Sequence, residues 1–128
     1  MIDTSVWIDF FRGVPSSETT LLRDCIGQRD RIFMTGVIAQ EILQGIRDDS
    51  LYQSIKDYLF LFDRLDVDFS DHIEAGNIYR GLRKAGVTIS SPIDCLIAFI
   101  AIRHNVSLLH KDSDFTLIAK HYPLLIVT

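Results

Sequence analysis

Four acidic residues lie far apart in the sequence: Asp3, Glu41, Asp94 and Asp112. Three of them lie near a predicted strand end or helix start, and Glu41 lies within a predicted helix. Carboxylate oxygens are the ligands that Mg²⁺ and Mn²⁺ prefer in proteins. Carboxylates that lie close together repel one another unless a cation is placed between them. We therefore expect these four residues to hold one or two divalent ions, which could activate a water for attack on a phosphodiester.

Glu41 is the most informative of the four. In the predicted helix VIAQEILQGI, residues 37–46, it projects within the arc that also holds Ile38, Ile42 and Ile46. A carboxylate in an apolar stripe costs free energy unless it is paired or bound to a cation. The alternative is a glutamate that reaches solvent along its stem or forms a salt bridge.

The other acids each have an ordinary structural explanation. Asp3 could cap a helix that begins near Ser5. Asp94 follows Ser91 by three positions in SPID and could complete a capping box. Asp112 could be a plain loop acid, as could the aspartate two positions after it. Four such coincidences at one sheet edge still favour a metal site.

The sheet itself is predicted from alternating strand and helix patterns. Strands are predicted at 32–35, 65–69, 106–110 and 124–128, although 65–69 could also be irregular. Helices are predicted at 37–46, 71–84 (ended by Gly86), 91–104 (begun by Ser91 and Pro92) and near 115–121. Met1 and Ile2 can be the tail of a first strand. The alternation predicts an α/β fold, a central parallel sheet flanked by helices on both faces, with its functional crevice at the carboxyl ends of the strands.

Length and composition predict one domain over residues 1–128. A chain of 128 residues with 48% hydrophobic residues can bury a substantial core. No apolar run approaches the roughly 18 residues that cross a bilayer, and no secretory signal is visible, so we expect a cytoplasmic protein without a membrane partner. Cys25 and Cys95 match no metal-ligand or redox spacing and are interpreted as buried free thiols.

The net charge of −4, from 17 acidic and 13 basic residues, argues against a general polyanion binder. An acidic protein can still act on nucleic acid when its carboxylates are gathered around bound cations, which reverse the local potential. The positions of the acids therefore matter more than their number.

Four segments in order carry a family resemblance: DTSVWIDFFRG, IAQEILQGI, SPIDCLIAFIA and LLHKDSDF. Together they resemble the PIN-domain ribonucleases of the VapC type, toxins of toxin–antitoxin pairs, over nearly the whole chain. The resemblance implies a parallel sheet, an Mg²⁺- or Mn²⁺-dependent endoribonuclease and inhibition by a cognate antitoxin. The sequence departs from the family at its start, where only two apolar residues precede the first aspartate, so we expect a short or frayed first strand.

The resemblance also assigns residues. Asp3, Glu41, Asp94 and Asp112 match the family's acidic positions. Asp114 would be a substitute ligand or a support for the ligands, and Thr4 or Ser5 would be the hydroxyl that supports the metal site. The basic residues nearest to these motifs are candidates for holding the RNA backbone: Arg12, Arg80, Arg83, Lys84 and Lys111. For each of them the alternative is an ordinary solvated surface charge.

Aromatic residues suggest protein partners. Trp7, Phe10, Phe11 and the run YLFLF at 58–62 exceed what one helix face buries. Core packing is the default explanation, and a groove for an antitoxin helix or the face of a homodimer is the alternative.

Other functions fit less well. DSDFT at 112–116 matches the pattern of haloacid-dehalogenase-like phosphatases, whose first aspartate is a nucleophile, but only 12 residues follow it where a long chain is needed. A phospho-acceptor domain usually has adjacent acids after its first strand, and DTS has one. A non-catalytic PIN-like module that binds RNA or protein is the main alternative to the ribonuclease.

Overall fold

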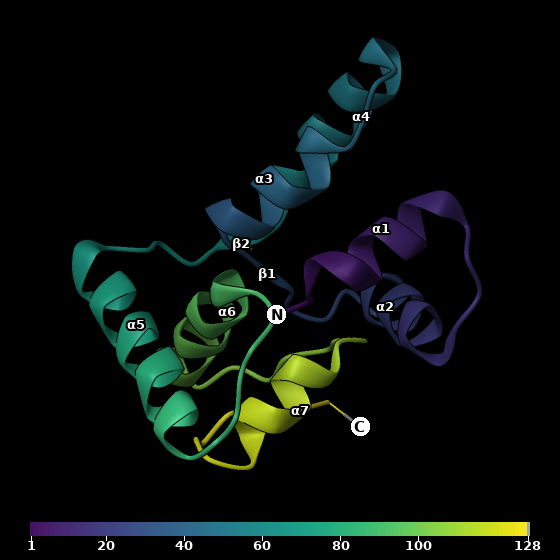
Figure 1. The fold of residues 1–128 in the computed structure, drawn as a ribbon. Helices are drawn as coiled ribbons and strands as arrows, with labels where there is room; N and C mark the ends of the chain where they lie inside the picture. Colours follow the sequence, from purple (N-terminus) through teal and green to yellow (C-terminus); the bar gives the residue numbers. More distant parts are fainter. Residues whose placement is uncertain (128) are drawn as a thin grey trace. The chain divides into compact units, whose positions relative to one another are not determined.

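The computed structural model describes residues 1–127, which form two compact units. The amino-terminal unit is Ile2–Asp66, and the carboxyl-terminal unit is 67–127 together with Met1. Both units are built mainly of helices (Figure 1). The amino-terminal unit also has a pair of short parallel strands, and the carboxyl-terminal unit has an isolated parallel bridge.

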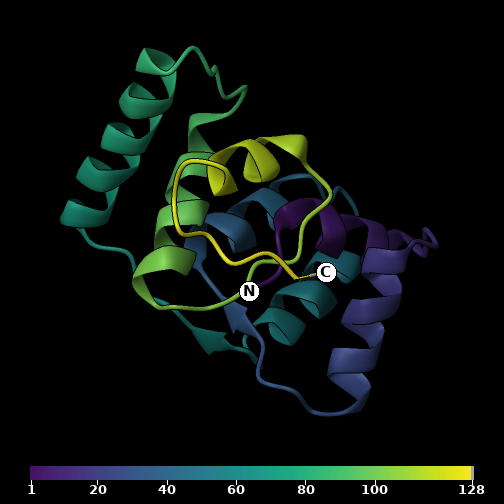
Figure 2. The same ribbon diagram turned by 90° about the horizontal axis from the view of Figure 1, so that it is seen from below.

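The amino-terminal unit has four helices and one pair of strands. Its elements are α1 (Thr4–Arg12), α2 (Ser17–Gly27), β1 (Phe33–Met34), α3 (Gly36–Gln44), α4 (Asp49–Leu59) and β2 (Asp63–Arg64). The strands pair in parallel, Phe33 with Asp63 and Met34 with Arg64, and Figure 2 shows them as two short arrows. Helix α1 packs against α2 and α3. Trp7 is fully buried there, because its indole stacks on Phe11 at a centroid distance of 5.6 Å and also contacts Phe62.

The carboxyl-terminal unit contains α5 (Phe69–Lys84), α6 (Pro92–Arg103) and α7 (Ser113–Ala119). Helices α5 and α6 lie side by side (Figure 1). They are joined near one end by Asp71 and Arg103, whose Oδ1 and Nε atoms are 2.7 Å apart. Since Asp71 stands near the start of α5 and Arg103 at the end of α6, the two helices form an antiparallel hairpin. Helix α6 is buried along most of its length, as its nearly continuous apolar sequence requires.

The predicted strand at 65–69 is wrong. The strand is Asp63–Arg64, residues 65–68 are irregular, and Phe69 begins α5. A capping box at the start of α5 outweighs the period-two pattern: the Asp71 amide donates to Asp68 Oδ1 at 3.2 Å, and the Asp68 amide donates to Asp71 Oδ2 at 2.9 Å.

The predicted strands at 106–110 and 124–128 are not formed as continuous strands in the described residues, where Leu108 and Ile126 form an isolated parallel bridge. The Leu108 amide donates to the Leu125 carbonyl at 2.8 Å, and the Val127 amide donates to the Leu108 carbonyl at 3.0 Å. Thr128 lies outside the described residues. Met1 borders this segment, since its carbonyl accepts from the Leu109 amide at 3.0 Å, which agrees with a short first strand.

The predicted helices are present with shifted ends. Helix 37–46 is α3, 71–84 is α5, 91–104 is α6 and 115–121 is α7, each beginning or ending within a few residues of its prediction. Gly86 follows α5 with φ 81°, a left-handed conformation that favours glycine. Helices α2 and α4 were not predicted. Within residues 1–127 no helix has the length and apolar character that a membrane crossing requires.

Candidate metal centre

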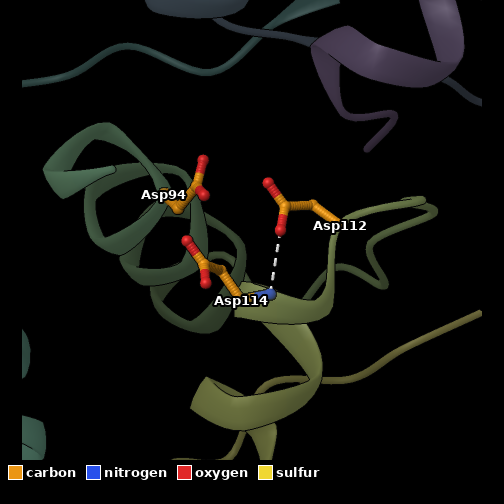
Figure 3. Close-up of side chains that lie close together, drawn as sticks. All are labelled: Asp94, Asp112 and Asp114. Atoms are coloured by element: carbon orange, nitrogen blue, oxygen red, sulfur yellow. Dashed lines mark hydrogen bonds between the residues drawn. The ribbon is translucent and has the colours of Figure 1, made fainter. Parts of the chain in front are cut away.

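Three carboxylates meet in the carboxyl-terminal unit. Asp94 comes from the first turn of α6, Asp112 precedes α7 and Asp114 lies in its first turn. One oxygen from each can be chosen so that all three lie within 4.8 Å of one another. Figure 3 shows the three carboxylates facing one another. This spacing suits a shared divalent cation with oxygen ligands.

Asp94 is placed by the way α6 begins. Pro92 occupies the first turn with its fixed φ, and the Asp94 amide donates to the Ser91 carbonyl at 3.0 Å. Within the described chain the Ser91 side chain makes no capping hydrogen bond, so the capping-box explanation for Asp94 is wrong. The carboxylate stands at a helix amino terminus, where the helix dipole favours negative charge.

Asp112 and Asp114 are held by one another and by a serine. Asp112 Oδ1 accepts from the Asp114 amide at 2.9 Å, which caps α7. Asp114 Oδ2 accepts from the Ser90 amide at 3.0 Å and from Ser90 Oγ at 2.6 Å. Asp112 lies in the loop before α7, so the loop-acid explanation fits its position, whereas Asp114 lies within the helix and the explanation is wrong for it. Ser90 was not identified from the sequence, where nothing marks it as the partner of an aspartate 24 positions away.

Cys95 lies beside the cluster, fully buried. Burial, and to a lesser extent the nearby charges of Asp94 and Asp114, raise the pKa of its thiol to about 11. The thiol is thus protonated at neutral pH and is a poor metal ligand, which leaves the oxygen donors to define the chemistry. Both cysteines are free, as predicted, although Cys25 is only half-buried.

In the amino-terminal unit two more carboxylates are held by hydroxyl groups. Asp3 Oδ2 accepts from Ser5 Oγ at 2.7 Å and, more weakly, from the Ser5 amide at 3.4 Å, so Asp3 also caps α1. Thr4 Oγ1 donates to Glu41 Oε1 at 2.8 Å. Both hydroxyl residues that the family resemblance singled out therefore orient an acidic side chain.

Glu41 is half-buried on α3, on the side that buries Ile38 and Ile42. Among residues 1–127 no ion pair to Glu41 is found, so the salt-bridge alternative is not what stabilises it. Its hydrogen bond comes from a neutral hydroxyl, which orients the carboxylate without neutralising its charge.

The residues present fit a hard divalent cation. Within the described part of the chain, none of Glu41, Asp112 and Asp114 forms an ion pair with lysine or arginine. Their hydrogen bonds come from hydroxyl and amide groups. Donors of this kind fix the direction of ligating carboxylates and leave their negative charge available to a metal ion.

The basic residues of α5 that were predicted to hold RNA lie near its carboxyl end. Arg80, Arg83 and Lys84 are exposed in the last turns of α5. Because the hairpin is antiparallel, this end of α5 lies toward the start of α6, where Asp94 stands. Lys111 is exposed immediately before Asp112.

Arg12 is exposed at the end of α1 in the other unit. It borders a pocket of about 320 Å³ whose lining is apolar apart from two arginines: Ile8, Phe11, Ile42, Ile46, Leu51 and Ile55 with Arg12 and Arg47.

The aromatic prediction is correct in part. Trp7 belongs to the core of the amino-terminal unit, as the default explanation requires. Phe60 and Leu61, in the run at 58–62, are 65% and 76% exposed and are not core residues.

Sequence comparisons identify relatives over almost the whole chain. A family model described as PIN domain matches residues 1–121. A VapC ribonuclease of Mycobacterium bovis and ribonuclease VapC11 of Mycobacterium tuberculosis are each 39% identical over 122 residues, which cover 94% of this chain and 91% of theirs.

Solved structures show the same fold at lower identity. A chain of VapBC2 from Rickettsia felis, bound to a DNA fragment from its promoter, has a TM-score of 0.77 at 18% identity, covering 99% of this chain and 96% of that chain. A chain of VapBC-1 from Haemophilus influenzae has a TM-score of 0.76 at 20% identity, covering 99% and 95%. The predicted α/β fold is thereby confirmed, and the chain belongs to the PIN-domain family, of the VapC type.

Proposed function

We propose that this protein is a divalent-metal-dependent endoribonuclease and the toxin of a toxin–antitoxin pair. The observation that carries the proposal is the cluster of Asp94, Asp112 and Asp114, with ligand oxygens within 4.8 Å of one another. The relatives that cover most of the chain are named as ribonucleases. An oxygen-only cluster in a protein of this family is suited to hydrolysis of RNA phosphodiesters.

Asp94 and Asp112 would ligate Mg²⁺ or Mn²⁺, with Asp114 as a further ligand. We extend the proposed ligand set to Asp3 and Glu41, supported by their family positions and by the hydroxyl groups that orient them. A bound divalent ion lowers the pKa of its water and stabilises charge on a phosphoryl group. The chain itself contributes the orientation of the carboxylates, through Ser90, Ser5 and Thr4.

The proposed substrate is RNA, held through its phosphates. Arg80, Arg83 and Lys84 are suited to this role, since they lie toward the end of the hairpin where Asp94 stands. Lys111 and Arg12 complete the proposed set of phosphate contacts. Neutralising any one of them should weaken RNA binding and reduce its dependence on salt concentration.

The proposed protein partners are an antitoxin and a second copy of the chain. Structures with the same fold include toxin–antitoxin complexes. The apolar pocket beside α1, α3 and α4, bordered by Arg12 and Arg47, is suited to an amphipathic segment with acidic residues.

The test combines metal binding with RNA cleavage. Calorimetry with Mn²⁺ should show binding by the parent chain and by Asp57→Asn, a control at an exposed acid of α4. Asp94→Asn should bind Mn²⁺ weakly and should not cleave single-stranded RNA. A folded parent chain that neither binds Mn²⁺ nor cleaves RNA would favour the non-catalytic binding module instead.

A further inference from the structure

A small groove of about 240 Å³ lies between α3, α4 and β2 of the amino-terminal unit, and we call it the α3–α4 groove. Its walls are apolar and consist of Met34, Ala39, Leu43, Leu59 and Phe60. Phe60 is 65% exposed, so part of this apolar wall faces water. Covering such a wall with an apolar group releases water and lowers the free energy.

Two cations border the α3–α4 groove, and no acid is among its lining residues in the described chain. These cations are Lys56 and Arg64. Within residues 1–127 no carboxylate forms an ion pair with either of them. Each lies over an aromatic ring instead: the Lys56 ammonium is 5.8 Å from the Tyr52 ring centroid, and the Arg64 guanidinium carbon is 5.4 Å from that of Phe60. A ring does not neutralise a cation, so the charge at the groove favours an anion.

The start of α3 opens into the same groove through Thr35 and Gly36. In the described chain the Thr35 side chain makes no capping hydrogen bond, and its Oγ1 atom is buried without a partner. The first amides of α3 therefore lack the capping acceptor that a helix usually receives from its own chain. Helix amino termini of this kind bind anions.

Gly36 leaves this helix end accessible. A Cβ atom at Gly36 would meet nothing within 4 Å, so the space beside it is open. Arg64 stands at the same end of α3, because it is the parallel-strand partner of Met34, two positions before Gly36. Free amides and a guanidinium thus lie together at one end of an apolar groove.

We propose that the α3–α4 groove binds a small amphipathic anion, a monocarboxylate with an apolar body. The carboxylate lies between the amino terminus of α3 and Arg64, and Lys56 adds positive charge. The apolar body lies against Leu43 and Leu59. The volume favours a small molecule over a segment of a partner protein, since it is below the roughly 300 Å³ at which pockets for drug-sized ligands begin.

The first test is calorimetric titration of the full chain with octanoate, in the presence of a chelator. The chelator prevents octanoate from binding through a metal ion at the carboxylate cluster. Octanoate should bind at least about tenfold more tightly than octan-1-ol, which has the apolar body without the charge, and than acetate, which has the charge without the body.

The second test changes the residues at the anionic end. Arg64→Gln should weaken octanoate binding about tenfold, because a charge-assisted hydrogen bond is lost. Gly36→Ala should weaken it about threefold by occupying the open space beside the helix terminus. The matched control is Arg23→Gln, an exposed arginine of α2 whose guanidinium carbon lies 5.9 Å from the Phe10 ring centroid, and it should bind octanoate as the parent does. Thermal unfolding confirms that each variant is folded.

The third test locates the ligand by the amide shifts that octanoate causes in nuclear magnetic resonance spectra. The largest shifts should occur at Gly36 and along the facing residues of α4. Largest shifts at Ile8 and Leu51 would place octanoate in the pocket beside α1 and overturn the proposal.

Three further results overturn it. The first is no saturable binding of octanoate up to about 10 mM. The second is equal weakening by Arg64→Gln and Arg23→Gln, or octan-1-ol binding as tight as that of octanoate. The third is loss of octanoate binding as the protein concentration rises, which would assign the groove to a second copy of the chain. All of these measurements are made without RNA, so their outcome is independent of the proposed ribonuclease activity.

Discussion

The amino termini of α5 and α6 carry a similar pattern and use it differently. Each has a residue of the capping type followed three positions later by an aspartate, Asp68 and Asp71 in α5 and Ser91 and Asp94 in α6. In α5 the two residues form a reciprocal capping box, and Asp71 also pairs with Arg103. In α6 the box is not formed, and Asp94 faces two further carboxylates.

The comparison shows what separates a structural acid from a candidate ligand. Asp71 is completely buried, but a guanidinium from its own chain compensates its charge. Asp94 belongs to a group of three carboxylates, whose mutual repulsion is relieved when a cation binds among them. Both aspartates follow a capping-type residue by three positions, and the difference comes from the side chains that tertiary structure brings to each of them.

The largest expected effect is on RNA cleavage, which should depend on Asp94 and not on Asp71. Asp94→Asn should lower RNA cleavage by about 100-fold or more, because a proposed metal ligand would be lost. Asp71→Asn should retain cleavage per folded molecule, while a lower temperature of unfolding reports the weakened pairing with Arg103. Cleavage rates normalised to folded protein provide the measurement. Loss of cleavage in a fully folded Asp71→Asn variant would contradict the distinction.

The next effect concerns the cation that compensates Asp71. Arg103→Met should lower the free energy of unfolding by about 2 to 3 kcal/mol, because a buried carboxylate loses its partner; the partial exposure of Arg103 keeps the loss below that of a fully buried pair. Urea denaturation measures it. Arg83→Met, an exposed control in α5, should change stability by no more than about 0.5 kcal/mol. Equal stability of both variants would show that the ion pair is not important.

A smaller effect is expected at the serine that holds Asp114. Ser90→Ala removes the 2.6 Å hydrogen bond from Ser90 Oγ, and Mn²⁺ affinity should fall about tenfold because the carboxylate loses its orientation. Calorimetric titration measures the affinity. Ser54→Ala, at an exposed position of α4, should bind Mn²⁺ as the parent does. An unchanged affinity in Ser90→Ala would exclude Asp114 from the metal site.

The smallest effect is a pH dependence at the start of α5. Hydrogen bonds from Ser70 Oγ and then from the Asp71 amide lower the pKa of Asp68 below its usual 3.8. A lowered pKa means that the ionised form stabilises the fold above the unfolded pKa, and that this contribution is lost as pH falls through the folded value. Asp68→Asn keeps a good helix cap without the titration. Its stability should fall less than that of the parent between about pH 4 and pH 2, measured by urea denaturation at each pH.

Some elements were predictable because local signals agree with one another. Helix α6 begins where Pro92 requires, and its apolar length predicts burial. The strands were less predictable. The prediction at 32–35 is confirmed by β1, Phe33–Met34, whereas β2 is only two residues long and cannot display a period-two pattern. At 65–69 the pattern was present, but the capping box of α5 started a helix at Phe69 instead. Helices α2 and α4 begin at the capping residues Ser16 and Asp48, which are the local signals that mark their starts in the sequence.

For the candidate site, the acidic residues could be predicted from the sequence better than the hydrogen bonds that hold them. Residue type and position selected the acids, and the family resemblance selected Thr4 and Ser5. Ser90 could not be predicted, because its bond to Asp114 depends on how the loop before α6 meets α7. The meeting of Asp3 and Glu41 with the three aspartates of the carboxyl-terminal unit stays a prediction.

The Asp112 carboxylate, which we propose as a metal ligand, also caps α7. Ion occupancy and the order of the last helix are then thermodynamically coupled, because a ligand that binds only the folded arrangement stabilises it. Fraying of the first turn of α7 would release the ion, and a bound ion would in turn protect that turn from fraying.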